Sequence, residues 1–314
     1  MIIILLFLLV WLLIHWWPYE NLEAFTLQNE LENYPIGNSY VYENVHDLIV
    51  AQPSVRSASN VLIYLINWPY GFGSALSVHA QNAIYLRKMN SDLTVLPHFS
   101  QNSKHFKYHQ QGYHNSFFLY FDLQIPLRKA NEYKIYFAKS TPLESVDTLD
   151  TTVIPPIRKP SNAALIDLMR HNFRVRDCFR PQELHRSDIG IHIRGAAQKK
   201  AHHPDYLATS IDERLKRLAN HVSATKVFVM SDVQAYINKA KEYFNDITFL
   251  SDIMRVANDS HDSIPELTNV GFKLGSDILR ECYVMSECDQ IYVSESNIPF
   301  IISLINPNVK MFGF

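Results

Sequence analysis

The stretch Asp188-Ile189-Gly190-Ile191-His192-Ile193-Arg194-Gly195 has the pattern of a buried parallel strand that opens into a loop at its carboxyl end. Open α/β sheets bind their ligands at the carboxyl ends of strands, so the last residues of this stretch are candidates for a ligand site. His192 and Arg194 are two residues apart and point to the same side of a regular strand. Arg194 offers a guanidinium fork to a phosphate, and Gly195 allows close approach of the backbone. The alternative interpretation is a strand end with a surface salt bridge.

The composition indicates a globular α/β protein with room for two domains. The chain has 314 residues, of which 47% are hydrophobic and 19% are charged, enough for a sizeable core. Its net charge is -2, with 29 basic and 31 acidic side chains. Without a basic excess, nucleic acid is not a predicted partner, and an anionic ligand must be met by local positive charge. The 3 cysteines are too few and too scattered for a disulfide framework or a zinc site.

Strands and helices alternate along the chain, which predicts parallel, doubly wound sheets. The apolar runs predict strands over 61–66, 93–96, 117–121, 189–193, 226–230, 247–250 and 290–293. The helical spacing predicts helices over about 75–88, 163–176, 205–220, 233–244, 273–287 and 298–305. We therefore expect two Rossmann-like domains, over residues 59–180 and 181–314, that face each other across a ligand cleft.

The N-terminal segment reads as a membrane anchor followed by a stem. Residues 1–17 are almost wholly apolar and end in Trp16 and Trp17, which fits a short transmembrane helix with an interfacial belt. A cleaved signal peptide is the rival, but the basic n-region and the small-residue cleavage site are absent. Residues 18–58 are polar and read as a stem. These features predict a single-pass type II membrane protein with its catalytic domain in the Golgi or ER lumen.

Polar residues follow several of the predicted strands, where a ligand would bind. In the second half they are Ser231 and Asp232 after one strand, and Ser294, Ser296 and Asn297 after another. In the first half, a strand, a glycine-bearing turn and a helix N-terminus could hold an anion or a sugar, through Gly71, Gly73 and Ser74, of which Ser74 is the predicted helix cap. The plainer alternative is a tight turn that needs glycine for its geometry. Glu281, on a mostly apolar helix, is either exposed to solvent or accepts the N–H groups of a base.

Taken together, these residues resemble the inverting fucosyltransferases of the α-1,6 and protein-O-fucosyl superfamily, which have a two-domain GT-B fold and use GDP-fucose. The resemblance covers about residues 60–305 and is strongest in the second half. The matching segments are Gly71-Phe72-Gly73-Ser74, Gly190-Ile191-His192-Ile193-Arg194-Gly195, Val227-Phe228-Val229-Met230-Ser231-Asp232 and the run from Asp277 to Asn297.

The resemblance implies roles for several of these residues in binding the donor. His192 would contact the guanine side of the nucleotide, and Arg194 the β-phosphate. Glu281 stands where the family has an acidic residue that reads guanine N–H groups. Ser296, with Asn297 beside it, falls at the serine that holds the β-phosphate. The chain contains no Asp-x-Asp, so we expect no metal and no resident cofactor, with arginine in place of the cation.

The chain departs from the family pattern in the loop that would face the glycan acceptor. After Arg194 the residues are Gly195-Ala196-Ala197-Gln198-Lys199-Lys200-Ala201-His202-His203-Pro204, and the first carboxylate is Asp205. An inverting transfer uses a general base to take the acceptor proton. His202, His203 and Asp205 are the candidates, although Asp205 could instead cap a helix. A catalytically inactive, membrane-tethered relative that binds a GDP-sugar or a glycan is therefore the alternative. Hydrolase and dehydrogenase motifs are absent from the sequence.

Overall fold

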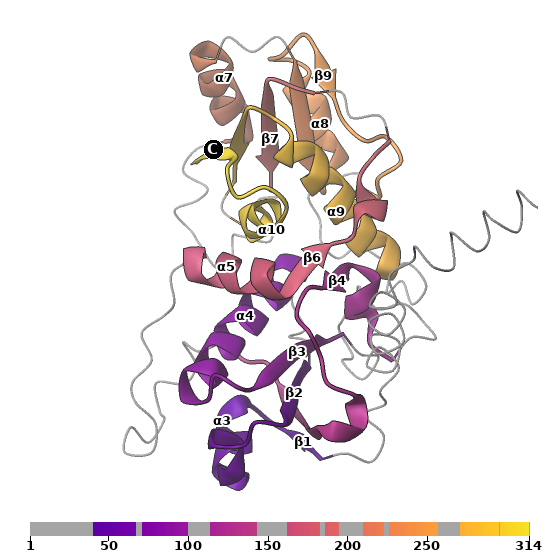
Figure 1. The fold of residues 1–314 in the computed structure, drawn as a ribbon. Helices are drawn as coiled ribbons and strands as arrows, with labels where there is room; N and C mark the ends of the chain where they lie inside the picture. The colour runs from indigo at the N-terminus through magenta and orange to yellow at the C-terminus, as the bar shows by residue number, and fades with distance from the viewer. Residues whose placement is uncertain are drawn as a thin grey trace, which may run out of the picture.

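The computed structural model describes residues 40–66, 71–99, 114–142, 162–182, 186–194, 210–222, 226–256, 271–294 and 296–313. Two α/β units, each built around a parallel sheet, are stacked along the long axis of the molecule (Figure 1). Within the described ranges, no helix is long and apolar enough to cross a membrane. The predicted anchor, 1–17, and most of the predicted stem lie outside them.

The first sheet has four parallel strands in the order β1-β5-β2-β3. These strands are β1 (Val41–Tyr42), β5 (Lys134–Lys139), β2 (Val61–Ile66) and β3 (Thr94–His98). Every residue of β2 is buried, as expected for a strand covered on both faces. Alternate residues of β2 belong to two different core clusters. One cluster includes apolar residues of α3 (Val45–Ala51), and the other includes Phe72 and Leu76 of α4 (Phe72–Met89).

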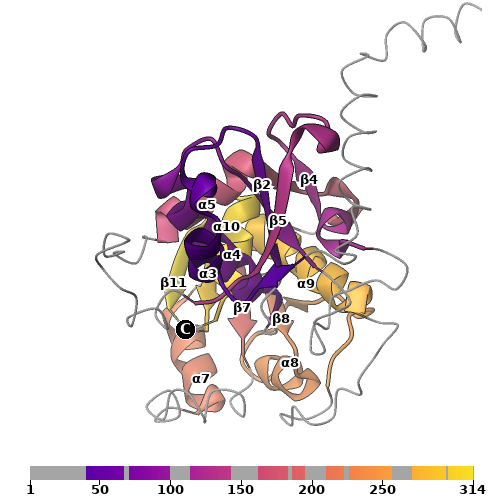
Figure 2. The same ribbon diagram turned by 90° about the horizontal axis from the view of Figure 1, so that it is seen from below.

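The second sheet has five parallel strands in the order β11-β10-β7-β8-β9. They are β11 (Lys310–Gly313), β10 (Gln290–Val293), β7 (Ile189–Ile193), β8 (Val227–Ser231) and β9 (Ile247–Thr248). Helices α7 (Ile211–His221) and α8 (Gln234–Ala240) cover one face, and α9 (Gly271–Ser286) and α10 (Ile298–Ile305) cover the other (Figure 2). This arrangement confirms the predicted α/β fold with parallel sheets.

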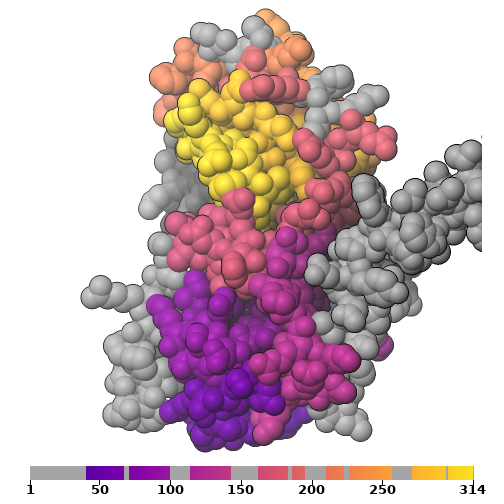
Figure 3. Space-filling view, viewed as in Figure 1, coloured from indigo at the N-terminus to yellow at the C-terminus, as the bar shows by residue number. Residues whose placement is uncertain are grey.

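A middle layer joins the two units. It consists of α5 (Asn162–Asn172) and a short antiparallel pair, β4 (Phe121–Leu123) with β6 (Phe173–Val175). In the space-filling view, α5 lies between the first unit below and the second above (Figure 3). One continuous core cluster runs from β2 and α4 through this layer to α9 and α10. The division into domains at residue 180 stays a prediction.

The structure corrects several local predictions from the sequence. The helix predicted at 163–176 ends at Asn172, because residues 173–175 form β6 and pair with β4. Residues 40–58, predicted as stem, contain β1 and α3 and contribute Val45, Leu48 and Ile49 to the core. Residues 117–121, predicted as a strand, are mostly a 3-10 helix (Ser116–Leu119) ahead of β4. Asn115 caps that helix, because its Oδ1 accepts from the backbone N–H of Phe117. The helix predicted at 75–88 begins earlier, at Phe72, so Gly71 and not Ser74 is its N-cap.

A buried histidine within α4 has an acid-sensitive environment. His79 is 2% exposed, its ring lies 6.1 Å from the Phe173 ring, and neither ring nitrogen has a hydrogen-bond partner among the described residues. Burial lowers the pKa of His79 from 6.5 to about 3, because the charged imidazole would lose its hydration. Between pH values of about 3 and 6.5, the unfolded chain therefore binds a proton at His79 and the folded chain does not.

We expect His79→Leu to remove part of the acid sensitivity of the fold. Relative to its value at pH 8, the free energy of unfolding of the wild type should fall at pH 5 by about 2 kcal/mol more than that of the variant. Urea denaturation at both pH values measures the difference, with the exposed His171→Leu as the control substitution. Equal losses in the wild type and His79→Leu would contradict the prediction.

Candidate functional site

The second sheet has its topological switch point between β7 and β10. Along the chain, β7 is followed by β8 and β9 on one side, and the chain then crosses to β10 and β11 on the other. Doubly wound sheets bind ligands in the crevice outside the carboxyl ends of the strands at this point. Arg194 follows β7 and Ser294 follows β10, so these two predicted site residues lie where the topology places a ligand.

Two buried serines fix the carboxyl end of β7. The Ser294 hydroxyl accepts from the backbone N–H of Arg194 at 3.2 Å, and the N–H of Ser294 donates to the carbonyl of His192 at 3.0 Å. On the other side, the Ser231 hydroxyl donates to the carbonyl of Ile193 at 2.8 Å. Because these bonds hold the backbone that leads into Arg194 from both neighbouring strands, its partly exposed side chain starts from a fixed position.

The N-termini of α4 and α10 meet at the boundary between the two units. Gly73 lies in the first turn of α4. A Cβ built on it would lie 2.7 Å from the backbone oxygen of Asn297, the N-cap of α10. Ser296 shapes this turn, since its hydroxyl accepts from the N–H of Ile298 at 3.1 Å. Helix N-termini carry partial positive charge and favour anions. Two of them therefore converge near the carboxyl end of the second sheet.

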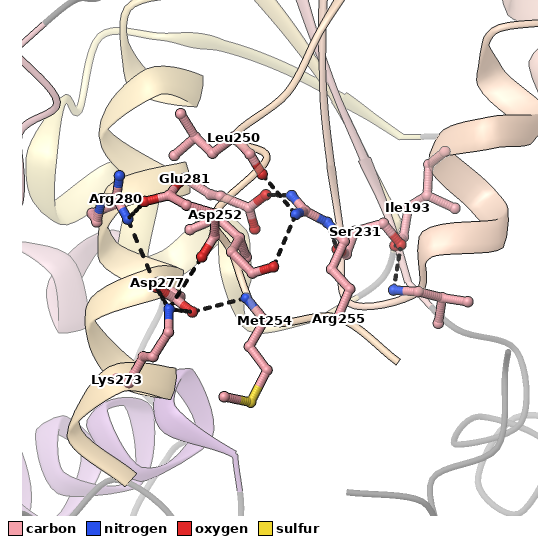
Figure 4. Close-up of polar contacts among 12 residues, drawn as sticks. Ile193, Ser231, Leu250, Asp252, Met254, Arg255, Lys273, Asp277, Arg280 and Glu281 are labelled. Atoms are coloured by element: carbon pink, nitrogen blue, oxygen red, sulfur yellow. Dashed lines mark hydrogen bonds and ion pairs between the residues drawn. The ribbon is translucent and has the colours of Figure 1, made fainter. Parts of the chain in front are cut away.

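Behind the carboxyl end of β8 lies a buried ion pair between Arg255 and Glu281 (Figure 4). Their side chains are only 3% and 5% exposed. Arg255 also donates from Nε to the carbonyl of Ser231 at 3.0 Å and from Nη1 to that of Leu250 at 2.7 Å. Nearby, Lys273 and the N–H of Met254 both bind the Asp277 carboxylate. These bonds tie the segment 250–256 to β8 and to α9.

Opposing effects act on the pKa of the Glu281 carboxyl. Burial raises the pKa of this carboxyl to about 8, the Arg255 guanidinium acts in the opposite direction, and the carboxylates of Asp277 and Asp232 add to the rise. Asp232 has a buried oxygen, Oδ1, that no hydrogen bond reaches within the described part of the chain. The base-reading role predicted for Glu281 stays a prediction, but the structure gives this side chain an internal partner.

The structure brings most of the predicted site residues to two neighbouring places. Arg194, Ser294, Ser296 and Asn297 lie at the switch point, and Gly73 lies against Asn297 across the boundary. His192 is 4% exposed and Ser231 is buried, and Gly71 and Ser74 belong to the N-terminus of α4. Asp232 and Glu281 form the second place, behind β8. Gly195, His202, His203 and Asp205 lie outside the described residues.

The sequence did not predict Arg255 as the cation that faces Glu281. Arg255 belongs to an irregular segment after β9, so no helical or strand spacing connects it with α9. One signal was available, because a carboxylate on an otherwise apolar helix needs a partner when it is buried. Among the described residues, no group of three or more histidines, cysteines and carboxylates could hold a metal ion.

The fold is that of an α/β protein with two parallel-sheet units, and it resembles the GT-B fold of fucosyltransferases. Fucosyltransferase NodZ from Bradyrhizobium has a similar structure, with a TM-score of 0.50, 15% sequence identity, and coverage of 82% of this chain and 95% of that one. A NodZ α-1,6-fucosyltransferase soaked with GDP-fucose has a TM-score of 0.47, 14% identity, and coverage of 81% and 95%. The resemblance to fucosyltransferases is thus confirmed for the fold. No family model and no curated protein matches the chain.

We expect Gly73→Ala to force α4 and the turn before α10 apart. The new Cβ would approach backbone atoms of Asn297, which cannot move aside as a flexible side-chain end could. The substitution should lower the free energy of unfolding by about 1–3 kcal/mol, despite the better helix propensity of alanine. Urea denaturation measures the loss. Gly313→Ala is the matched control, because nothing lies within 4 Å of its Cβ. An unchanged Gly73→Ala protein would show that this contact does not constrain the site.

Proposed function

We propose that the chain is a metal-independent, inverting glycosyltransferase that moves fucose from GDP-fucose to a glycan or glycoconjugate acceptor. The observation that carries the proposal is the convergence of Arg194 with the N-termini of α4 and α10 at the switch point of the second sheet. A guanidinium and helix-terminal amides are donors for a diphosphate. A fold similar to that of a fucosyltransferase supports the same proposal.

The proposed reaction is a single displacement at the anomeric carbon of the sugar. The acceptor hydroxyl oxygen forms the new bond, the bond from the anomeric carbon to the β-phosphate oxygen breaks, and GDP leaves with the bonding electrons. Arg194 would stabilise the charge that develops on this leaving group, in the place that a metal ion takes in other transferases. A general base takes the acceptor proton, and His202, His203 and Asp205 are the proposed candidates.

The membrane location is a separate proposal. Residues 1–17 would anchor the protein as a single-pass type II protein, with residues 40–313 in the lumen of the ER or Golgi. The triplet Asn258-Asp259-Ser260 is a glycosylation acceptor, so a lumenal chain expressed in a eukaryotic cell should carry a glycan that endoglycosidase treatment removes. A chain that is never modified, with the triplet accessible to the glycosylation machinery, would argue against this orientation.

The decisive experiment is calorimetric titration of the full chain with GDP in the presence of a chelator, with UDP as the control. Selective binding of GDP without metal supports the proposal and leads to an activity screen with GDP-fucose and glycan acceptors. If the chain bound no nucleotide, its similarity to fucosyltransferases would be limited to the fold.

An inactive relative is the second candidate. The sequence between Arg194 and Asp205 lacks a carboxylate where the family has one in its acceptor loop. GDP binding without transfer to any acceptor and without hydrolysis of GDP-fucose would favour this binding function.

We expect Arg194→Ala to weaken GDP binding by about a hundredfold or more, because charge-assisted bonds to phosphate are lost. The fold should persist, since the β7 backbone is held by Ser231 and Ser294. Calorimetry with GDP measures the loss. Arg217→Ala, an exposed arginine on α7 in the same unit, is the control for net charge. Unchanged affinity of Arg194→Ala would remove this residue from the site.

A further inference from the structure

Each of the three guanidinium nitrogens of Arg255 donates a hydrogen bond. Its Nε bonds to the end of β8, its Nη1 bonds to Leu250 and Ile253 within its own segment, and its Nη2 bonds to Glu281 of α9. The side chain is almost fully buried. A buried charge held by this many acceptors has little freedom to move, so it fixes the groups around it relative to one another.

Arg255 is also the cation in direct contact with Glu281 among the described residues. The other charged groups that act on Glu281 are the carboxylates of Asp277 and Asp232. Lys273 is bound to Asp277, and Arg280 is bound mainly to Asp252, on the outer side of α9. Oε1 of Glu281 accepts from Arg255. The buried Oδ1 of Asp232 is an acceptor that no hydrogen bond reaches within the described part of the chain.

We infer that Arg255 is a positioning residue of the donor site: it joins the end of β8 to Glu281, so that Asp232 and Glu281 present one preformed set of acceptors to the guanine base. This inference rests on the proposed function. It adds the residue that makes the base subsite selective, which neither the motifs nor the similar folds assign.

The chemistry of the bases explains why such acceptors would select guanine. Guanine presents a ring N–H beside an amino group, so one ionised carboxylate can accept from both. Adenine and uracil place an acceptor beside their donor, and that acceptor would face the carboxylate oxygen with like partial charge. A protonated Glu281 could not accept both bonds. The guanidinium of Arg255 opposes the effect of burial on the pKa of Glu281 and so favours the form that binds guanine.

The test is calorimetric binding of GDP and of inosine diphosphate, which lacks the amino group, to the full-length wild type and Arg255→Gln. We expect Arg255→Gln to weaken GDP binding by about tenfold or more and to lose most of the preference for GDP over inosine diphosphate. Arg280→Gln is the matched control, because it also breaks an ion pair between α9 and segment 250–256, while among the described residues its side chain forms ion pairs with Asp252 and Asp277 and not with Glu281. It should keep both the affinity and the preference.

A pH series separates positioning from a purely structural effect. In the wild type, GDP affinity should rise with pH as Glu281 ionises, with a midpoint near the pKa of about 8. In Arg255→Gln the midpoint should move to higher pH, because the charge that opposed the rise in pKa is gone. Arg255→Lys restores the charge without the fork and should bring the midpoint back toward that of the wild type. Should Arg255→Gln fail to fold, the Arg255→Lys and Glu281→Gln proteins carry the same comparison.

Each outcome bears on a different claim. A wild type that binds no GDP overturns the proposed function and this inference together. A wild type that binds GDP, with Arg255→Gln equal to Arg280→Gln in affinity, base preference and pH midpoint, overturns only the role of Arg255. Loss of affinity with an unchanged preference and an unchanged midpoint would reduce Arg255 to a residue that stabilises the fold.

Discussion

The continuous apolar core between the two sheets is the constraint on which the site depends. Contacts between domains are usually polar enough to allow relative motion, but here aromatic side chains cross the boundary. The Tyr120 ring packs 5.2 Å from the Phe272 ring of α9, and Gly275 is placed so that a Cβ would lie 2.6 Å from Tyr120. Because apolar interiors are close-packed, such contacts define one separation between the units. The N-termini of α4 and α10 therefore meet in a fixed geometry.

The net charge of the chain is -2, so the protein as a whole does not attract anions. Positive charge for an anion must come from local groups. Arg194 and the helix N-termini lie on one side of the site, and the carboxylates of Asp232 and Glu281 lie behind β8. This separation suits a molecule that is anionic at one end and rich in N–H donors at the other, as a guanosine diphosphate is. A carboxylate is tolerated inside the core because it pairs with the guanidinium of Arg255, which backbone carbonyls hold in place.

The sequence predicted the second unit better than the first, for physical reasons. The strands 189–193 and 290–293 and the helix 298–305 were predicted to the residue, because buried parallel strands are unbroken apolar runs with sharp polar ends. The strand predicted from the aromatic run at 117–121 was wrong. The side chain of Asn115 accepts hydrogen bonds from the N–H groups of Phe99 and Phe117, and this local bonding overrides strand propensity. The elements in 40–58 are too short for periodicity to reveal. The strand-end residues of the site were readable from sequence, whereas Arg255 was not, because its place depends on tertiary structure alone.

The two halves of the proposed reaction depend on different kinds of structure. The groups for the donor are fixed by strand ends, helix N-termini and a buried ion pair, all of which belong to the core of the fold. The candidates for the general base, by contrast, belong to the segment that follows Arg194, where the sequence departs from the family pattern. The residues proposed for the donor thus match the family pattern, whereas the segment that holds the proposed general base departs from it.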